Sequence, residues 1–219
     1  MSTRQVAEAS LALPTPPAVV SLDPKYLGDV LEDIWRVARA TGTEAVAAPL
    51  VAGLQARIDA VTARTASLTQ RPRVLHLEWV EPLMCGGHWI PEMVELAGGV
   101  NCFGDKHSGS YRLEWEEIVA SQPEVILVMP CGFDVPRALQ DIPLLAQHEA
   151  WATLPAVQQQ RVYVIDANAY TSRSGPRLVY GLESIAEMLH PTLFAGMTPA
   201  GGVVRVPAEQ LRGARVDIR

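Results

Sequence analysis

Three short stretches of the sequence carry side chains that could bind a ligand. They run from Trp79 to Trp89, from Cys131 to Phe133 and from Tyr170 to Arg173. Together they supply aromatic rings, sulfur atoms, an imidazole and a guanidinium, and their glycines let a ligand approach the backbone. This combination is typical of a surface that recognises a large, flat, partly apolar molecule. The candidate ligand-binding residues are Trp79, Met84, His88, Trp89, Cys131, Gly132, Phe133, Tyr170 and Arg173.

Metal binding and catalysis are less well supported by the residue pattern. Cys85 and His88 have the spacing of a metal-binding pair, but no second pair lies nearby to complete a four-ligand zinc site. Cys131 could act as a nucleophile only beside a base, and the local sequence shows no signature for one. Phosphate-binding glycine loops and the serine nucleophile elbow are also absent from the sequence. We therefore predict no catalytic residue, no metal site and no cofactor, and keep a small cytosolic enzyme using Cys131 or His88 as an alternative.

Several of the candidates also have a purely structural interpretation. Trp79 and Trp89 are equally compatible with core packing, because large aromatic side chains are often mostly buried. His88 is also compatible with an ordinary hydrogen-bonded loop histidine, and Arg173 with a surface cap. The choice between ligand binding and packing therefore depends on where the fold places these side chains.

The three stretches follow three apolar segments that are predicted to be strands. These segments are Val74–Leu77, Val125–Met129 and Arg161–Asp166. Helices are predicted between and after them, from Pro91 to the glycines at 98 and 99 and from Arg177 to Leu189. This alternation predicts an α/β fold with a Rossmann-like, doubly wound parallel sheet. Because the carboxyl ends of parallel strands lie at one edge of a sheet, we expect the three stretches to converge there.

The first seventy residues have a different organisation. We predict a short helix within residues 3–13 and a strand at Ala18–Leu22. Two apolar helical stripes follow within residues 26–70, separated by a break at Thr41-Gly42-Thr43, and we expect them together to form a long, nearly continuous connecting helix. The expected boundaries are therefore residues 1–25, the long helix at 26–70, an α/β lobe at 71–194, and a tail at 195–219 without assignment.

Composition limits the class of partner and the location. The formal net charge is −6 and the isoelectric point about 5.4, which argues against nucleic acid as the main partner. The apolar runs are too short to span a membrane, and the first twenty residues lack the continuous apolar segment of a signal peptide. If Met1 is the true start, this predicts a cytoplasmic chain. Three cysteines without metal-finger spacing argue against a disulfide framework.

The order of three sequence motifs resembles a known family of transport proteins. The motifs are LEWVEPL followed by GGHWIPEMVELAGG, then EWEEIVASQPEVILVMPCGFD, then RVYVIDANAYTSRSGPRLVYGLE. They resemble the cobalamin (vitamin B12) and iron–siderophore type periplasmic binding proteins of ABC importers, which have two α/β lobes joined by a long backbone helix. By this resemblance, residues 26–68 correspond to the backbone helix and residues 73–194 to the second lobe. Most of the first lobe has no counterpart, so we expect residues 1–22 to be its remnant in a truncated or one-lobed protein.

The resemblance implies a function, partners and a location. The chain would bind cobalamin or a related corrinoid non-catalytically and deliver it to a membrane permease, at the periplasmic or cell-surface side. An iron–siderophore or haem is the alternative ligand, and a remnant that binds no ligand is a third interpretation. Tyr170 falls where the family places an aromatic ring against its ligand, and Glu92 is a candidate for docking on the transporter. A sheet edge exposed by the missing lobe would favour a homodimer.

Overall fold

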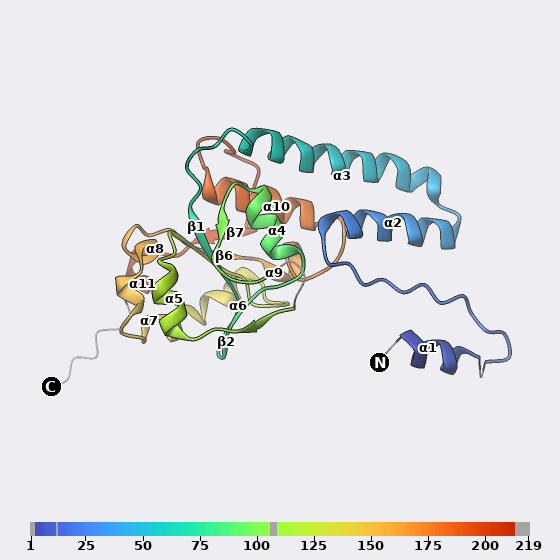
Figure 1. The fold of residues 1–219 in the computed structure, drawn as a ribbon, viewed down its shortest axis with the longest axis horizontal. Coiled ribbons are helices and arrows are strands. Elements are labelled where there is room, and N and C mark those ends of the chain that lie inside the picture. Colours follow the sequence, from blue (N-terminus) through green and yellow to red (C-terminus); the bar gives the residue numbers. More distant parts are fainter. Residues whose placement is uncertain (1–2, 12, 106–108, 213–219) are drawn as a thin grey trace.

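The computed structural model describes residues 3–11, 13–105 and 109–212 (Figure 1). The strands are β1 (Arg73–Val80), β2 (Leu83–Cys85), β3 (Val100–Asn101), β4 (Tyr111–Arg112), β5 (Val125–Val128), β6 (Val162–Ile165) and β7 (Val203–Arg205). The helices are α1 (Thr3–Ser10), α2 (Leu27–Thr41), α3 (Glu44–Thr65), α4 (Trp89–Leu96), α5 (Trp115–Ser121), α6 (Val135–Leu139), α7 (Ile142–Ala146), the 3-10 helix η1 (Trp151–Thr153), α8 (Pro155–Gln158), α9 (Ala167–Tyr170), α10 (Leu178–Leu189) and α11 (Ala208–Leu211).

The strands form a single sheet with a parallel centre and antiparallel edges. Its order is β4-β2-β1-β5-β6-β7, and β3 also pairs with β1. Strands β1, β3, β5 and β6 are parallel, as the alternation of strands and helices predicts. The predicted parallel sheet is confirmed as the centre of a mixed sheet. At its edges β2 and β4 turn back beside β1, and β7, from the unassigned tail, runs against β6.

Both faces of the sheet are covered by helices, which makes the fold doubly wound. Along β5, Val125 and Leu127 contact one core while Ile126 and Val128 contact the other, as side-chain alternation along a strand requires. Helices α2, α3, α4 and α10 cover the first face, and α5 to α8 with α11 cover the second (Figure 1). Burial on both faces explains why β5 is a continuous apolar run with no polar residue.

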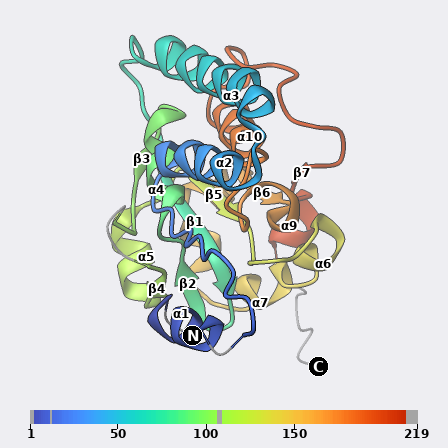
Figure 2. The ribbon, with the colours of Figure 1, turned by 90° about the vertical axis from the view of Figure 1, so that its right-hand side faces the viewer.

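The long helix expected over residues 26–70 is two helices that lie side by side. Gly42 has a φ of +67°, a left-handed conformation that ends α2. Helix α3 is the long helix, with 22 residues, and it runs back along α2 as a hairpin (Figures 1 and 2). Arg57 on α3 joins this hairpin to α10 through two hydrogen bonds to the Glu183 carboxylate, at 2.8 and 2.5 Å.

The predicted strand at Ala18–Leu22 is wrong. These residues are extended but pair with none of the described strands, and Val19, Val20 and Leu22 are exposed. An extended segment with no neighbouring strand cannot form the inter-strand hydrogen bonds that define a sheet. Helix α1, which was expected, lies apart from the sheet and its covering helices (Figure 1).

Gly181 on α10 sets the distance between this helix and the last residue of α9, Tyr170. A Cβ atom at this position would overlap the Tyr170 carbonyl oxygen and lie 3.0 Å from the Met93 Cε. We predict that Gly181→Ala lowers the free energy of unfolding by about 1–3 kcal/mol, because packed backbone must shift. Gly53→Ala is the matched control: nothing lies within 4 Å of its added Cβ, and alanine in an exposed helix should raise stability by about 0.5–1 kcal/mol. Urea unfolding measures both, and equal shifts would contradict this description.

Candidate functional site

A cavity of about 330 Å³ lies where the parallel strands end at their carboxyl side. Its walls come from the end of β1, the start of α4, the segment after β5 and the segment after α9. Its lining includes Glu78, His88, Trp89, Met129, Cys131 and Thr171. Residues 22–24, which lead into α2, close one side. The convergence expected at this edge of the sheet is therefore present in the structure.

Trp89 and Thr171 join two walls of the cavity. The Trp89 indole Nε1–H donates a hydrogen bond to the Thr171 backbone oxygen at 2.8 Å, across 82 residues of sequence. Thr171 is 5 % exposed, and its Oγ1 is buried and makes no hydrogen bond to any of the described residues. The cavity therefore has a rigid aromatic wall and, beside it, a buried hydroxyl without a protein partner.

His88 has an unusual backbone conformation at the start of α4. Its φ is +55° and its ψ −125°, a combination that residues with a side chain rarely adopt. Such conformations cost about 1–3 kcal/mol and concentrate in ligand-binding segments. The His88 ring centroid lies 5.8 Å from that of Trp89, so the two rings line the cavity as neighbours.

Two carboxylates line the cavity, and no lysine or arginine is among the described residues that line it. Asp23 forms an ion pair with Lys25 at 2.9 Å, which offsets its charge. Glu78 accepts a hydrogen bond from the Ser110 hydroxyl and is in none of the ion pairs between described residues. Its half-buried carboxylate thus gives the cavity a negative character.

A buried histidine positions the backbone around Glu78. His76 Nε2 lies 2.7 Å from the Asn101 Oδ1 and 2.9 Å from the Phe103 oxygen, while the Gly86 N–H donates to Nδ1 at 3.1 Å. Nε2 therefore carries the proton and Nδ1 accepts, which is the neutral imidazole. Burial lowers the pKa of His76 from the usual 6.5 to about 4.

Three of the nine predicted ligand-binding residues, His88, Trp89 and Cys131, line this cavity. Trp79 and Phe133 form a separate aromatic pair, edge to face with ring centroids 5.5 Å apart. The Arg137 guanidinium lies 4.2 Å above the Phe133 ring. Gly132 is next to the cavity, where its N–H donates to the Ser172 Oγ at 3.0 Å. The structure therefore divides the predicted aromatic surface into two groups.

Tyr170, Arg173 and Met84 contact other parts of the chain. Tyr170 packs against Gly202 of the tail, where an added Cβ would lie 2.9 Å from its ring. Arg173 donates to the Asn168 Oδ1 at 2.6 Å, and Met84 is a half-buried residue of β2. None of the three lines the cavity. Glu78 and Thr171 were absent from the predicted set. Glu78 lies near the end of β1, and Thr171 directly follows α9, the short helix after β6.

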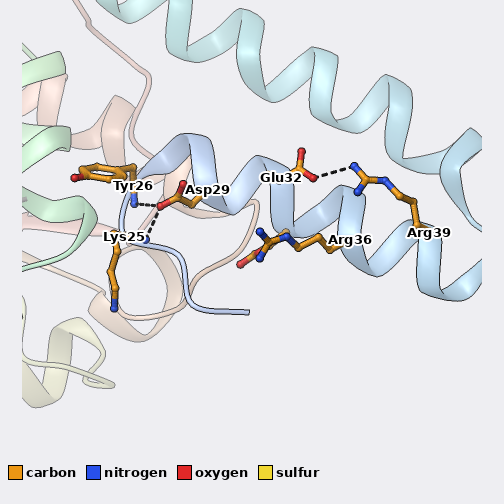
Figure 3. A network of polar contacts seen from close by, with 7 residues as sticks. Lys25, Tyr26, Asp29, Glu32, Arg36 and Arg39 are labelled. Atoms are coloured by element: carbon orange, nitrogen blue, oxygen red, sulfur yellow. Dashed lines mark hydrogen bonds and ion pairs between the residues drawn. The ribbon is translucent and has the colours of Figure 1, made fainter. Parts of the chain in front are cut away.

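Glu92, predicted to dock on a transporter, makes a contact within the chain. Its Oε2 accepts a hydrogen bond from the Leu27 N–H at 2.8 Å, at the first residue of α2. Next to it, the Asp29 Oδ2 accepts from the backbone N–H groups of Lys25 and Tyr26 (Figure 3). These carboxylates satisfy N–H groups that a helix start leaves without partners. They hold the start of α2, and with it residues 22–24, against the cavity.

The described residues contain no group of three or more histidine, cysteine or acidic side chains that could hold a metal ion. Cys85 is buried, its Sγ lies 3.7 Å from the Tyr111 oxygen, and burial raises the pKa of its thiol. Among the helices of the described part of the chain, none is long and apolar enough to cross a bilayer.

Comparison with known proteins shows one family that matches most of the chain. Residues 5–169 match the family described as periplasmic binding protein. An uncharacterized ABC transporter substrate-binding lipoprotein of Bacillus subtilis (strain 168) is 27 % identical over 177 residues, which are 78 % of this chain and 53 % of that protein. A vitamin B12-binding protein of Vibrio cholerae serotype O1 is 31 % identical over 104 residues, 47 % of this chain and 34 % of that protein. The chain thus spans about half the length, or less, of these relatives.

A solved structure is similar over most of this chain. The periplasmic haem-binding protein of Roseiflexus sp. RS-1, in its apo form, has a TM-score of 0.66 and 26 % sequence identity. The similarity covers 78 % of this chain and 65 % of that protein. The sheet and its covering helices are therefore similar in architecture to part of that haem-binding protein.

The neutral state of His76 predicts a dependence of stability on pH. As the pH falls below 6.5, His76 becomes protonated in the unfolded chain. In the folded chain it stays neutral until the pH reaches about 4. The free energy of unfolding should therefore fall by about 3 kcal/mol across this window. The His76→Gln variant should be less stable at every pH, and it should lose this part of the pH dependence. Burial also lowers the pKa of the partly buried His190, and its contribution to the pH dependence is the same in both proteins.

Urea unfolding at several pH values between 4 and 7 measures this effect. His148→Gln, on the other face of the sheet, serves as the control and should keep the pH dependence of the unchanged protein. An identical pH dependence in the unchanged protein and in His76→Gln would show that the imidazole is not held neutral.

Proposed function

Because the chain belongs to the periplasmic binding protein family, we propose that it is a solute-binding component of an ABC importer that binds a corrinoid such as cobalamin. The observation that carries the proposal is the cavity at the carboxyl ends of β1, β5 and β6, with Trp89 in its wall. Ligands of open α/β sheets bind at this edge. The vitamin B12-binding relative supports the corrinoid, and the ABC transporter substrate-binding relative supports delivery to a permease.

The alternative ligand is haem or an iron–siderophore. The Roseiflexus haem-binding protein supports it, because it shares the architecture and about a quarter of its sequence with this chain. All of these molecules are flat or rounded metal chelates whose apolar surface suits an aromatic wall. These ligands differ in the chemical groups at their periphery, and such groups would be next to the two carboxylates that line the cavity.

A non-catalytic role is supported by the family, which binds solutes. Cys131 and His88 do line the cavity, so the alternative of a small enzyme retains a specific test. Activity on any substrate that is lost in Cys131→Ala and His88→Ala would favour the enzyme. Retained ligand binding in both variants favours the binding protein.

The location and the transporter contact belong to the same proposal. Family membership supports a periplasmic or cell-surface location and a membrane permease as the protein partner. Glu92 stays a candidate for docking on that permease, and its hydrogen bond to the start of α2 supports a structural role beside it. The acidic net charge of −6 fits a protein that binds solutes and not nucleic acid.

We predict that the full chain binds cyanocobalamin, measured by absorbance titration with the oligomeric state read in the same sample. Trp89→Phe keeps an aromatic ring but loses the hydrogen bond to Thr171, so the two walls loosen and the dissociation constant should rise about tenfold. Trp115→Phe is the matched control, because Trp115 packs against His148 on the opposite face of the sheet.

The titration series also includes haemin and ferrichrome as representatives of the alternative ligands. Binding of any one of the three chelates with the expected effect of Trp89→Phe supports the cavity as the site. If none of the three binds, the proposed function is wrong for this chain. If Trp89→Phe and Trp115→Phe weaken binding equally, the ligand site is elsewhere.

A further inference from the structure

A second cavity lies at the opposite edge of the sheet, where the central parallel strands begin. Its volume is about 550 Å³, so it is larger than the cavity described above. The two cavities share none of their described lining residues. We call it the amino-end cavity, because its lining includes residues that directly precede β1, β5 and β6. The polar side chains in its lining are Thr69, Gln70, Arg71, Glu124, Arg161 and His190.

The side chains around the amino-end cavity leave it positively charged. Arg71 and Arg161 take part in none of the ion pairs between described residues. Glu124 is the one carboxylate among the described lining residues, and Arg73 offsets its charge. The Glu124 Oε2 accepts a hydrogen bond from the Arg73 backbone N–H at 3.0 Å and lies 3.4 Å from the Arg73 Nη1. Two guanidinium charges therefore line one cavity without a counter-ion in the described part of the chain.

Both guanidinium groups are held in place by the end of a helix. The Arg71 Nη2 donates a hydrogen bond to the oxygen of Thr65, the last residue of α3, at 3.0 Å. The Arg161 Nη2 donates to the oxygen of Leu189, the last residue of α10, also at 3.0 Å. Each bond uses one of the five N–H groups of a guanidinium, so further donors remain for a ligand. Because the two side chains are already positioned, ligand binding costs less conformational entropy.

His190 lies within the electrostatic reach of both guanidinium groups. Its Nε2 is 3.1 Å from the Gly98 oxygen, which can only accept, so this nitrogen carries a proton. Burial lowers the pKa of His190, and the positive charges of Arg161 and Arg71 lower it further. The two arginines therefore act on the same small region, and an anion bound there would interact favourably with both.

A phosphate group matches this arrangement. It carries up to two negative charges and three acceptor oxygens, so two guanidinium groups can share it through paired N–H···O bonds. A single carboxylate has one charge and two oxygens, which one guanidinium already satisfies. We propose that the amino-end cavity is a binding site for a phosphate group. The volume of about 550 Å³ is in the range of small-molecule sites, so a phosphate ester also fits.

Isothermal titration calorimetry with inorganic phosphate tests this inference, at an ionic strength held constant with potassium chloride. We expect the full chain to bind phosphate with a dissociation constant of about 1 mM or lower. Acetate, a single carboxylate, should bind roughly tenfold more weakly. Absence of phosphate binding to the full chain, together with absence of binding to the phospholipid vesicles below, would overturn the inference. Equal affinities for phosphate and acetate would also overturn it.

Substitution of the two arginines locates the bound phosphate. Arg71→Gln and Arg161→Gln each remove one charged donor group, so each should weaken phosphate binding about tenfold. Arg39→Gln is the matched control: it removes the same charge, but Arg39 donates to Glu32 on α2. Its phosphate affinity should equal that of the unchanged protein. Equal weakening in Arg39→Gln and in the two cavity variants would show that binding depends only on net charge, and it would overturn the site.

A further variant keeps the test decisive if Arg161→Gln folds poorly after losing its hydrogen bond to α10. Arg71 is exposed, and Arg71→Lys keeps the positive charge and a hydrogen-bond donor. It should bind phosphate roughly threefold or more tightly than Arg71→Gln. Equal affinities in these two variants would contradict an anion site at Arg71.

The phosphate group could belong to a soluble molecule or to a lipid headgroup, and vesicles distinguish these sources. Co-sedimentation with vesicles of phosphatidylcholine and phosphatidic acid, reduced in Arg71→Gln, would assign a headgroup. Binding of inorganic phosphate without co-sedimentation would assign a soluble phosphate compound, and both results support the cavity.

The inference is independent of the proposed solute-binding function, because it concerns a separate cavity. Arg71→Gln should leave the affinity for cyanocobalamin unchanged, and Trp89→Phe should leave the affinity for phosphate unchanged. A loss of phosphate affinity in Trp89→Phe would contradict two separate sites and overturn the inference.

Discussion

A neutral imidazole in the middle of β1 holds together the segments that shape the candidate site. His76 binds Asn101 of β3 and Phe103 of the segment after it, and it binds the segment before α4 through the Gly86 N–H. Glu78 lies two residues farther along the same face of β1, at the cavity, and His88 lies two residues beyond Gly86. Protonation of His76 would remove the acceptor for Gly86 and bury a charge. The cavity therefore depends on an uncharged histidine that does not line it.

The central architecture follows from the sequence because it depends on short-range patterns. The apolar segment of β5 lies between Pro123 and Pro130 and can only be a buried strand. The stripe along α10 and the glycines after α4 likewise predict helix positions within one or two residues. The rule that ligands bind at the carboxyl ends of parallel strands then places the site at the observed edge.

The remaining features depend on distant contacts or on the exact end of a strand. Nothing local shows that β2 pairs back on β1 or that α3 folds beside α2. Strand β1 continues to Val80, and its register with β2 shifts between Leu77 and Trp79. In this arrangement Glu78 lines the cavity, while Trp79 meets Phe133. A prediction that ended the strand near Leu77 therefore favoured Trp79 over Glu78 as a cavity residue. That the Thr171 hydroxyl is buried without a hydrogen-bond partner among the described residues depends on packing, which the local sequence does not show.

The central claim is that the ligand binds at the carboxyl ends of β1, β5 and β6, and amide hydrogen exchange tests it most directly. The full chain would be measured with and without saturating cyanocobalamin. We predict that exchange slows in residues 86–90, 131–132 and 171–174, which line or adjoin the cavity, and stays unchanged along α3. Slower exchange confined to the α2–α3 hairpin, or to residues around Phe133 and Arg137 alone, would contradict the claim.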